Sequence, residues 1–382
     1  MDNRQDRYSS AYNDNVGSDD SQLPQQYNSN PVIRVGITQG DINGIGLEVI
    51  VKALGEPEIL DSLIPIVYGS PKAMGFYRKN IEVSSFNLNI VRGAEEAHAR
   101  RINVVSCGDD NVHVEPGIST QAGGLAAYES LKAAVTDLKS GKIDILVTAP
   151  INNKNIQGDN FRFPGQTEFL QSEVGNGAKS LMLNIAGNVR VGIVAGHMPI
   201  AQVPNYITKD RILEKLRIFN ASLQKDFTIR RPRIAVLGLN PHAGDCGLLG
   251  SEEEEVIIPA IEQASEEGIF AMGPYSADAI FGSDVLNKFD GVLAMYHDQG
   301  VAPFKSLALE CGVSYTAGLP FVRTAPGHGT AYDIAGQGKA TPDSMRAAIW
   351  LAIDVYKNRR QNAEISASPM VLRAETVRER NA

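Results

Sequence analysis

Three histidines share a placement that suits metal chemistry. Each of His197, His242 and His297 follows a short run of β-branched or aliphatic residues that predicts a buried strand. The runs cover residues 191–195, 234–239 and 292–295. In an open α/β sheet the carboxyl ends of the strands form the edge where ligands bind. Three neutral imidazoles would leave a coordination position open for substrate or water, as catalytic metal sites require.

Each histidine could instead be a hydrogen-bonded residue that happens to end a strand. This alternative explains one such histidine as well as metal binding does, but it explains all three together less well, because the chain has six histidines in total. Cys246 lies close to His242 and could be a fourth ligand, although a structural thiol explains it better. The residues leave the metal open, since three histidines suit zinc, cobalt or manganese about equally.

Two cations in the carboxyl-terminal third stand among apolar and glycine residues. Arg323 offers a planar fork and Lys305 a compact charge, a pair that suits a phosphate or a carboxylate. The alternative is two solvated surface charges. Asp245 and Asp298 lie beside metal-binding positions and could orient ligands or transfer protons, and capping of a helix or loop explains each equally well.

Two glycine-rich loops could approach a ligand closely. Residues 40–46 lie between a predicted strand and a predicted helix, but their spacing is not that of a Rossmann fingerprint, and a tight turn explains them equally well. Residues 328–338 hold His and Asp among several glycines. Ordering so many glycines costs entropy, so the second loop is predicted to wrap a ligand.

The elements that position these residues alternate between strands and helices. Such alternation predicts an α/β fold with mostly parallel sheets that are covered by helices on both faces. Further predicted strands cover residues 32–37, 64–68 and 143–147, and predicted helices cover 47–54 and 124–138.

The composition indicates a soluble cytoplasmic enzyme. A length of 382 residues allows about two domains with a shared cleft. The net charge of −8 argues against nucleic acid or an anionic membrane as the main partner. No stretch approaches the roughly 20 apolar residues that cross a bilayer, and the amino terminus lacks a secretory signal. Three cysteines without paired spacing suit a reducing compartment.

Six motifs that follow one another between about residues 32 and 358 resemble those of the 4-hydroxythreonine-4-phosphate dehydrogenase family of vitamin B6 biosynthesis. They are Ile-Thr-Gln-Gly-Asp at 37–41, Val-Thr-Ala-Pro-Ile-Asn at 147–152, Phe-Pro-Gly-Gln-Thr-Glu-Phe at 163–169, Gly-Leu-Asn-Pro-His-Ala-Gly at 238–244, Tyr-His-Asp-Gln-Gly at 296–300 and Gly-Leu-Pro-Phe-Val-Arg-Thr at 318–324. The loop 328–338 also resembles the adenosine-binding loop of isocitrate and isopropylmalate dehydrogenases, whose two-domain fold this family shares.

The resemblance implies a division of the chain into two domains and two tails. The first α/β domain, on the nucleotide side, would comprise residues 31–145 and 300–366, and the second, on the metal and dimer side, residues 146–299. Residues 1–30 are too polar to bury a core and are predicted to be disordered, and the charged tail 367–382 is predicted to fray.

Carried over by position, the resemblance implies the ligands of the site. His197, His242 and His297 would bind a divalent ion, which could be zinc, cobalt, manganese or magnesium. One of the three would come from a neighbouring subunit, which implies a homodimer with active sites at the interface. The implied substrate-binding residues are Gln166, Thr167, Lys305, Ser314 and Arg323, and the implied cofactor-binding residues are His328, Gly329, Ala331, Asp333 and Ile334. The cofactor would be NAD or NADP. A 2′-phosphate would need a nearby cation, for which Lys339 is a candidate, although a solvated surface charge explains this lysine better.

The implied reaction oxidises 4-phosphooxy-L-threonine to 2-amino-3-oxo-4-phosphooxybutanoate. This β-keto acid would lose carbon dioxide to give 3-amino-2-oxopropyl phosphate. A divalent metal would lower the pKa of the substrate hydroxyl and polarise the ketone that forms. Lys305, Asp245 and Asp298 are the candidate catalytic residues.

Four positions depart from the family pattern. Gln166 stands in place of a histidine, Ser314 of a substrate-contacting asparagine, Gly327 of an aspartate and Asn153 of a lysine. A glutamine cannot become cationic or act as a base near neutral pH. Two alternatives therefore stay open, namely a dehydrogenase of another phosphorylated four-carbon acid, such as phosphoerythronate or phosphothreonate, and a paralogue that binds ligands without turnover.

Overall fold

The computed structural model describes residues 32–367 apart from 82–86, 110 and 309. The predicted tail 1–30 and residues 368–382 of the predicted carboxyl-terminal tail lie outside the described residues.

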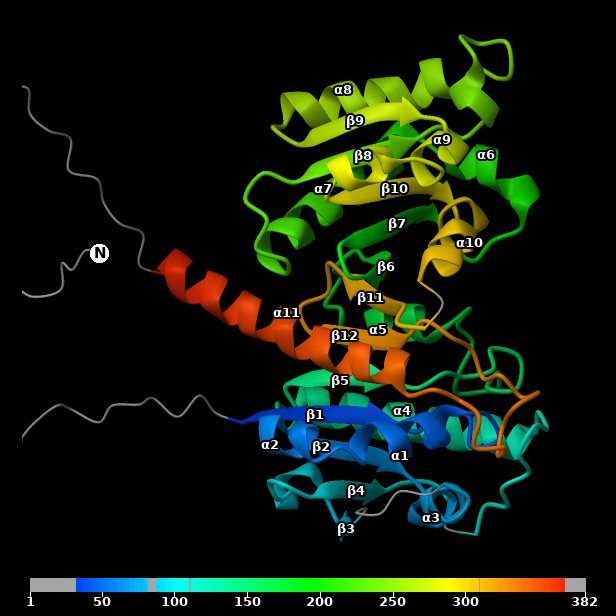
Figure 1. Cartoon of the computed structure of the whole chain (residues 1–382), viewed down its shortest axis with the longest axis vertical. Coiled ribbons are helices and arrows are strands. Elements are labelled where there is room, and N and C mark those ends of the chain that lie inside the picture. Colours follow the sequence, from blue (N-terminus) through cyan, green and yellow to red (C-terminus); the bar gives the residue numbers. More distant parts are fainter. Residues whose placement is uncertain (1–31, 82–86, 110, 309, 368–382) are drawn as a thin grey trace, which may run out of the picture. The chain divides into compact units, whose positions relative to one another are not determined.

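A single mixed sheet runs through the described residues. Its strands are β1 (Ile33–Thr38), β2 (Leu63–Gly69), β3 (Leu88–Val91), β4 (Ile102–Ser106), β5 (Ile145–Thr148), β6 (Leu181–Ala186), β7 (Val189–Ala195), β8 (Arg233–Leu237), β9 (Phe270–Tyr275), β10 (Gly291–Tyr296), β11 (Val313–Ala317) and β12 (Val322–Pro326). Their order across the sheet is β3-β4-β2-β1-β5-β12-β11-β6-β7-β10-β8-β9 (Figure 1).

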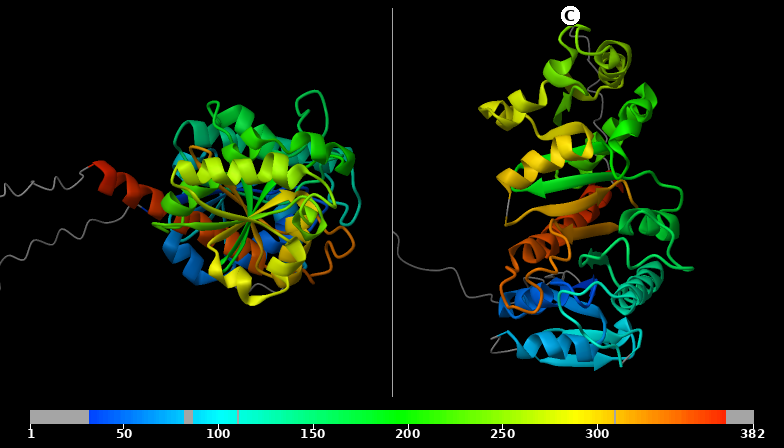
Figure 2. Two further views of the ribbon diagram at one scale, coloured as in Figure 1. Left: turned by 90° about the horizontal axis from the view of Figure 1, so that it is seen from above. Right: turned by 90° about the vertical axis from the view of Figure 1, so that its right-hand side faces the viewer.

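Most strand pairs of this described sheet are parallel, and the exceptions lie in its middle. The antiparallel pairs are β12–β11, β11–β6 and β6–β7. Each strand is rotated relative to its neighbour, so that in a view along the stack the strands fan out (Figure 2). The predicted α/β class with mostly parallel strands is confirmed, and the antiparallel pairing of β11 with β6 makes one sheet where several were predicted.

Helices cover both faces of the sheet. They are α1 (Gly46–Leu54), α2 (Pro57–Ser62), α3 (Pro71–Lys79), α4 (Gln121–Lys139), α5 (Gln166–Val174), α6 (Val203–Tyr206), α7 (Lys209–Lys225), α8 (Ile258–Glu266), α9 (Ala277–Phe281), α10 (His297–Leu307) and α11 (Asp343–Ala367). The hydroxyls of Thr120 and Thr208 cap α4 and α7 by accepting backbone N–H bonds. Among the described helices, none is both long and apolar enough to span a membrane.

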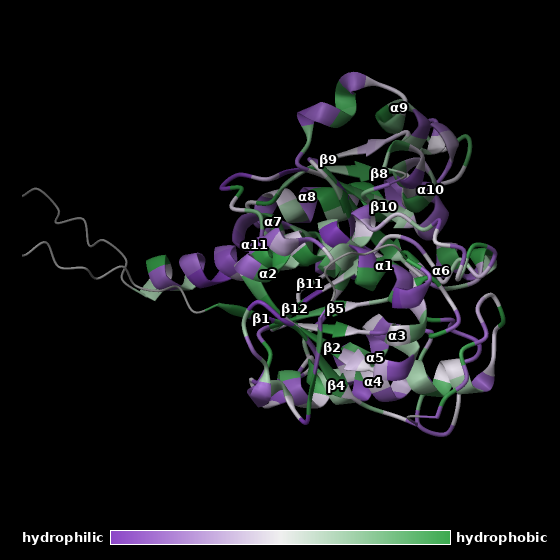
Figure 3. Ribbon diagram, turned by 60° about the horizontal axis from the view of Figure 1, so that its bottom comes forward, coloured by the Kyte–Doolittle hydropathy of each residue, from purple (hydrophilic) through white to green (hydrophobic). Residues whose placement is uncertain are grey.

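The strands are buried on both faces, as their apolar runs predict. In β10, Leu293 and Met295 belong to the core of one face, which packs against α1, α3, α7, α8 and α11. Val292 and Ala294 belong to the opposite face. We call these the first and second faces. The strands are coloured mostly as hydrophobic and lie between helices that carry both hydrophilic and hydrophobic residues (Figure 3).

The second face differs from the first because its apolar packing is interrupted. One cluster packs beneath α4 and α5, and a separate cluster packs beneath α10. The strands between the two clusters are β5, β12, β11 and β6. On this face they carry Thr148, Arg323, Thr316 and Asn184, all of which are buried. The middle of the second face is therefore polar.

The predicted domain segments occupy different stretches of the sheet with one exception. In the sheet order, the strands of residues 31–145 and 300–366 extend from β3 to β11, and β6, β7, β8, β9 and β10 follow beyond β11. The exception is β5, which falls almost wholly in the segment 146–299 but pairs with β1 and β12. The segment boundaries themselves stay a prediction.

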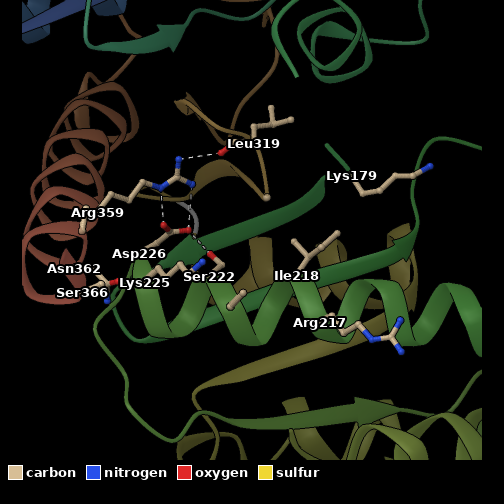
Figure 4. Close-up of a pocket in the computed structure, with 13 residues that line it drawn as sticks. Lys179, Arg217, Ile218, Ser222, Lys225, Asp226, Leu319, Arg359, Asn362 and Ser366 are labelled. Carbon is tan, nitrogen blue, oxygen red and sulfur yellow. Dashed lines mark hydrogen bonds and ion pairs between the residues drawn. The ribbon is translucent and has the colours of Figure 1, made fainter. Parts of the chain in front are cut away.

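A buried ion pair joins α7, α11 and β11 (Figure 4). Asp226 follows α7 and accepts from Arg359 Nε at 2.7 Å, from the Tyr315 hydroxyl at 2.7 Å and from the Ser222 hydroxyl at 2.6 Å. Arg359 Nη1 also donates to the Leu319 carbonyl at 3.0 Å. Burial, with Asp226 adding to it, raises the pKa of Tyr315 well above its usual value, so its hydroxyl stays a donor. Ser222, Asp226 and Arg359 line a surface cavity of about 710 Å³.

We predict that Arg359→Met lowers the free energy of unfolding by about 3 kcal/mol, because it leaves the buried Asp226 carboxylate without its cation. The matched control is Arg360→Met on the same helix, where the ion pair with Glu364 is exposed, and a loss below about 0.5 kcal/mol is expected. Urea unfolding of both variants measures the difference. Equal losses would show that the Asp226 pair does not stabilise the fold.

Candidate active site

Two of the three predicted metal ligands lie next to each other. His197 follows β7 and His297 follows β10, and these strands are parallel neighbours with Val292 opposite Val191. Their carboxyl ends therefore lie side by side. The two imidazole rings have centroids 5.5 Å apart. They line a cavity of about 340 Å³ together with Met198, Tyr296 and Asp298.

Asp298 orients one of these rings. Its Oδ1 lies 2.6 Å from His297 Nδ1. A carboxylate only accepts, so Nδ1 donates and Nε2 keeps its lone pair. A carboxylate behind a histidine is the arrangement that fixes imidazole ligands in metal sites. The His197–His297 pair therefore fits a divalent ion by the chemistry of its donors, and Asp298 contacts one of the two rings.

His242 lies apart from that pair. The strand β8 ends at Leu237, and His242 stands in a turn with left-handed backbone (φ 55°). Within the described ranges of this one chain, no three metal-ligating side chains form a cluster. Asp278 on α9, a residue that sequence reasoning missed, has a lowered pKa, mainly because Ser276 donates a hydrogen bond to it and to a small extent because His242 is close. Asp245 is exposed, and its backbone amide donates to the His242 carbonyl at 3.3 Å.

Two side chains hold the strand ends that carry the histidines, and sequence reasoning missed both. Gln299 donates from Nε2 to the Gly238 carbonyl at 2.6 Å and accepts from the Met295 amide at 2.7 Å, so it ties the end of β10 to the end of β8. Glu253 is 2% exposed and accepts from the amides of Leu239 and Asn240 at 2.7 and 2.8 Å. Gln299 could have been found from its place two residues after His297.

Arg323 is a buried cation with neutral hydrogen-bond partners. It is 5% exposed and donates to the Thr148 hydroxyl at 2.7 and 3.1 Å. It also donates to Thr316 at 3.2 Å and to Thr167 at 3.3 Å. Burial lowers the pKa of Arg323 to about 10, which nearby Glu168 partly opposes, so the group is still cationic at neutral pH. A cation buried without an ion pair among the described residues is prepared for an anionic ligand.

The first turn of α5 borders this guanidinium. Gln166 is 8% exposed, donates from Nε2 to the Ala149 carbonyl at 3.0 Å and accepts from Arg323 Nη2 at 3.4 Å. Thr167 follows it. The free amides at a helix amino terminus favour negative charge, and α5 adds this to the charge of Arg323. The structure thus brings Gln166 and Thr167 together with Arg323, and their contact with a substrate stays a prediction.

The loop 328–338 borders a separate cavity of about 440 Å³. Of the predicted cofactor-binding residues, the lining includes His328, Gly329, Ala331 and Ile334 but not Asp333, which is exposed. Lys305 and Lys339 line the same cavity, so the structure places Lys305 beside this loop.

His328 presents an unpaired nitrogen to its surroundings. Its Nδ1 lies 3.0 Å from the Gly329 carbonyl, to which it donates, and its Nε2 is buried without a partner among the described residues. Burial, reinforced by Lys305 and opposed by the bond to Gly329, lowers the pKa of His328. The ring is therefore neutral at pH 7, and Nε2 can accept a hydrogen bond, such as one from an adenine amino group. This orphaned acceptor fits a nucleotide cofactor.

The first glycine loop supports the second one. The Ile45 amide donates to the Thr330 carbonyl at 2.9 Å, and a Cβ on Gly44 would lie 2.8 Å from that same oxygen. The Tyr332 hydroxyl donates to buried Asp41 at 2.7 Å. The glycine at position 44 is thus needed for contact between the two loops.

Three of the four departures from the family pattern have a local cause or context. A Cβ on Gly327 would lie 2.6 Å from the Gly312 carbonyl, so a side chain would require a backbone shift. Ser314 lies in β11 opposite Asn184 of β6. Asn153 is exposed, and its carbonyl accepts from Gln157 at 2.9 Å.

Comparisons with known proteins agree on a family. A family model described as pyridoxal phosphate biosynthetic protein PdxA matches residues 61–352. A 4-hydroxythreonine-4-phosphate dehydrogenase of Bacteroides thetaiotaomicron is 52% identical over 338 residues, with 88% of this chain and 93% of the relative covered. A putative D-threonate 4-phosphate dehydrogenase of Oceanobacillus iheyensis is 38% identical, with 84% and 97% covered. The crystal structure of 4-hydroxythreonine-4-phosphate dehydrogenase from Klebsiella pneumoniae matches with a TM-score of 0.71 at 31% identity, with 85% and 99% covered.

We predict that Asp298→Asn weakens Co²⁺ binding roughly 10- to 100-fold, because the amide no longer fixes the His297 ring as a carboxylate does. His297→Ala, which removes a ligand, should cause a larger loss. Calorimetric titration with Co²⁺ measures both, and Asp354→Asn, an exposed carboxylate on α11, is the control. Wild-type affinity in His297→Ala would exclude this pair as a metal site.

We also predict that Arg323→Met weakens binding of inorganic phosphate roughly 10- to 100-fold, because hydrogen bonds to a charged group are lost. Arg323→Lys should rescue only part of the affinity, since an ammonium cannot reproduce the planar fork. Arg162→Met, at an exposed arginine paired with Asp159, controls for the change of charge. Phosphate affinity that is unaffected in Arg323→Met would contradict the assignment.

Proposed function

The chain belongs to the PdxA family of pyridoxal phosphate biosynthetic proteins, and we propose that it is an NAD(P)-dependent and divalent-metal-dependent 4-hydroxythreonine-4-phosphate dehydrogenase. The observation that carries the proposal is Arg323, a buried cation with neutral partners, because the substrate has a phosphate and a carboxylate to offer it. A phosphorylated small molecule is also the substrate class named for the relatives.

The proposed reaction moves a hydride from the substrate carbon that bears the free hydroxyl to the nicotinamide and releases a proton. The product, 2-amino-3-oxo-4-phosphooxybutanoate, is a β-keto acid. It loses carbon dioxide and gains a proton to yield 3-amino-2-oxopropyl phosphate.

Binding and orientation fall to the side chains around Arg323. The guanidinium binds an anionic group of the substrate, and Thr148 and Gln166 fix its orientation. Thr167, at the start of α5, can donate its hydroxyl to the same anion while its oxygen accepts from Arg323. Because these partners are neutral, they orient the cation without neutralising it. The substrate thereby supplies the charge that the buried site lacks.

His197 and His297 are the residues of this chain that would hold the divalent ion. Asp298 keeps His297 in the tautomer whose Nε2 can act as a ligand. When bound, the ion would supply Lewis acidity for oxidation of the hydroxyl and for the later loss of carbon dioxide.

The loop 328–338 would hold the nucleotide, whose nicotinamide accepts the hydride when it is bound. His328 offers a neutral acceptor, and Gly329, Ala331 and Ile334 line the cavity. Lys305 and Lys339 add positive charge, which suits the phosphates of a dinucleotide.

We further propose a homodimer in which His242 completes the metal site of the partner subunit. Two observations support it. His242 lies apart from the His197–His297 pair of its own chain. In the same loop, Leu248 and Leu249 are 77% and 42% exposed, which suits burial against a second copy.

We also propose that the protein is located in the cytoplasm. The free cysteines Cys107, Cys246 and Cys311 support this location.

One observation favours a second substrate. Gln166 lies against Arg323 where the family pattern has a histidine, and it cannot become cationic. A dehydrogenase of another phosphorylated four-carbon acid would tolerate this change, and one 38% identical relative is named for D-threonate 4-phosphate. The 52% identical relative favours the first substrate.

We expect the purified, metal-loaded protein to form NADH from NAD when 4-phosphooxy-L-threonine is added. The rate is measured by the absorbance of NADH, and a chelator should abolish it. Gln166→His should change the pH dependence of KM between pH 5 and 8, because it introduces a group that titrates there. Turnover of 4-phospho-D-threonate alone would establish the second substrate. If neither acid is oxidised and Gln166→His does not restore activity, the protein is not a dehydrogenase of either acid.

A further inference from the structure

Asn184 in β6 is a buried amide that lacks a hydrogen-bond partner. Its side chain belongs to a residue that is 7% exposed, and its Nδ2 makes no hydrogen bond within the part of the chain that the structure describes. Buried polar groups in folded proteins are almost always paired, and an unpaired donor is costly. The amide therefore points to a ligand that is not part of the chain.

The strand pattern fixes the face on which Asn184 lies. Its neighbours Leu183 and Ile185 belong to the core of the first face, so Asn184 lies on the second face. In the antiparallel register Asn184 stands opposite Ser314 of β11, and Ser314 stands opposite Ala325 of β12. Directly opposite residues share a face.

Arg323 and Thr316 lie on that same face. Thr316 is two residues after Ser314, and its hydroxyl accepts from Arg323 at 3.2 Å. Arg323 is two residues before Ala325, so both belong to one side of β12. Asn184 thus lies in the polar interruption of the second face, in the row next to that of Arg323. The strands β6, β11 and β12 run side by side here (Figure 1).

No polar group of the neighbouring strand positions serves this amide. The position opposite Asn184 on β7 is Val191, which is fully buried and apolar. On the other side, Ser314 has a short side chain that makes no hydrogen bond to Asn184 among the described residues. A structural role would require a partner that these positions do not offer.

We propose that Asn184 is a substrate-binding residue, whose amide donates a hydrogen bond to an oxygen of the same phosphorylated hydroxy acid that Arg323 binds. This inference rests on the proposed function. It also accounts for Ser314, which stands where the resembling family carries a substrate-contacting asparagine. In this chain the amide side chain is on β6, at Asn184, and the facing position on β11 is Ser314. In the resembling family the asparagine is on β11.

The test first removes the amide at position 184 and then places an amide at position 314 on the facing strand. Asn184→Leu deletes the donor, Asn184→Asp deletes it at nearly constant size, and the double variant Asn184→Leu with Ser314→Asn restores an amide on the facing strand. Ile185→Val is the matched control, because it alters the next residue of β6 on the opposite face. Calorimetry gives the dissociation constants of 4-phosphooxy-L-threonine, of 4-phospho-D-threonate and of NAD for each variant, independent of turnover.

We expect both single variants to weaken binding of the phosphorylated acid about 10-fold or more, with NAD affinity and the thermal midpoint unchanged. The double variant should recover affinity to within about threefold of wild type, and Ile185→Val should match wild type. Asn184→Ala, which deletes the donor without adding a charge that would itself repel the anion, decides the matter if Asn184→Leu fails to fold.

Wild-type affinity in both single variants would overturn the inference, as would a double variant no tighter than Asn184→Leu. If the wild-type protein binds one of the acids but does not oxidise it, the proposed function fails. The dissociation constants of the variants then still test whether Asn184 binds that acid. If it binds neither acid, both proposals fail.

Discussion

Arg323 is the point on which the rest of the site depends. A sheet buried on both faces has no water with which to solvate a cation, so the burial of this guanidinium must be compensated by fixed neutral oxygens and by a ligand. Three threonines and Gln166 supply the oxygens. The apolar packing of the second face stops on either side of this group, which is why the candidate substrate site lies in the middle of the sheet.

The metal-binding candidates obey a different constraint, because they stand on turns beyond the strands rather than in the sheet. Such turns need anchors. Gln299 ties the ends of β8 and β10 together, and buried Glu253 holds the amides that follow β8. These anchors leave His242 on an exposed turn with left-handed backbone, a position that suits a contribution to a second subunit.

The cofactor loop is supported in yet another way. Its Thr330 carbonyl and Tyr332 hydroxyl are held by Ile45 and Asp41 of the first glycine loop. These contacts offset the entropy that glycine-rich backbone loses when it becomes ordered. A rigid loop can present His328 as a preformed acceptor. The buried cation, the anchored turns and the paired loops are therefore three separately supported parts of the candidate site. The turns follow β8 and β10, which run antiparallel to β1 and β12, so along the sheet they lie at the edge opposite to the paired loops.

The sequence by itself determined the elements and most candidate residues, because these depend on local patterns. The apolar runs before His197 and His297 are strands, and alternation along the chain yields the mostly parallel sheet. Motif order was enough to suggest the family, and the comparisons confirm it. Only the tertiary structure decided which residues meet. Strand pairing between distant segments decides that Asn184 faces Ser314 and that Gln299 bridges two strand ends. It also decides that His242 stands apart from the other two histidines. Local sequence carries no record of pairing, since it is fixed by burial of the whole sheet.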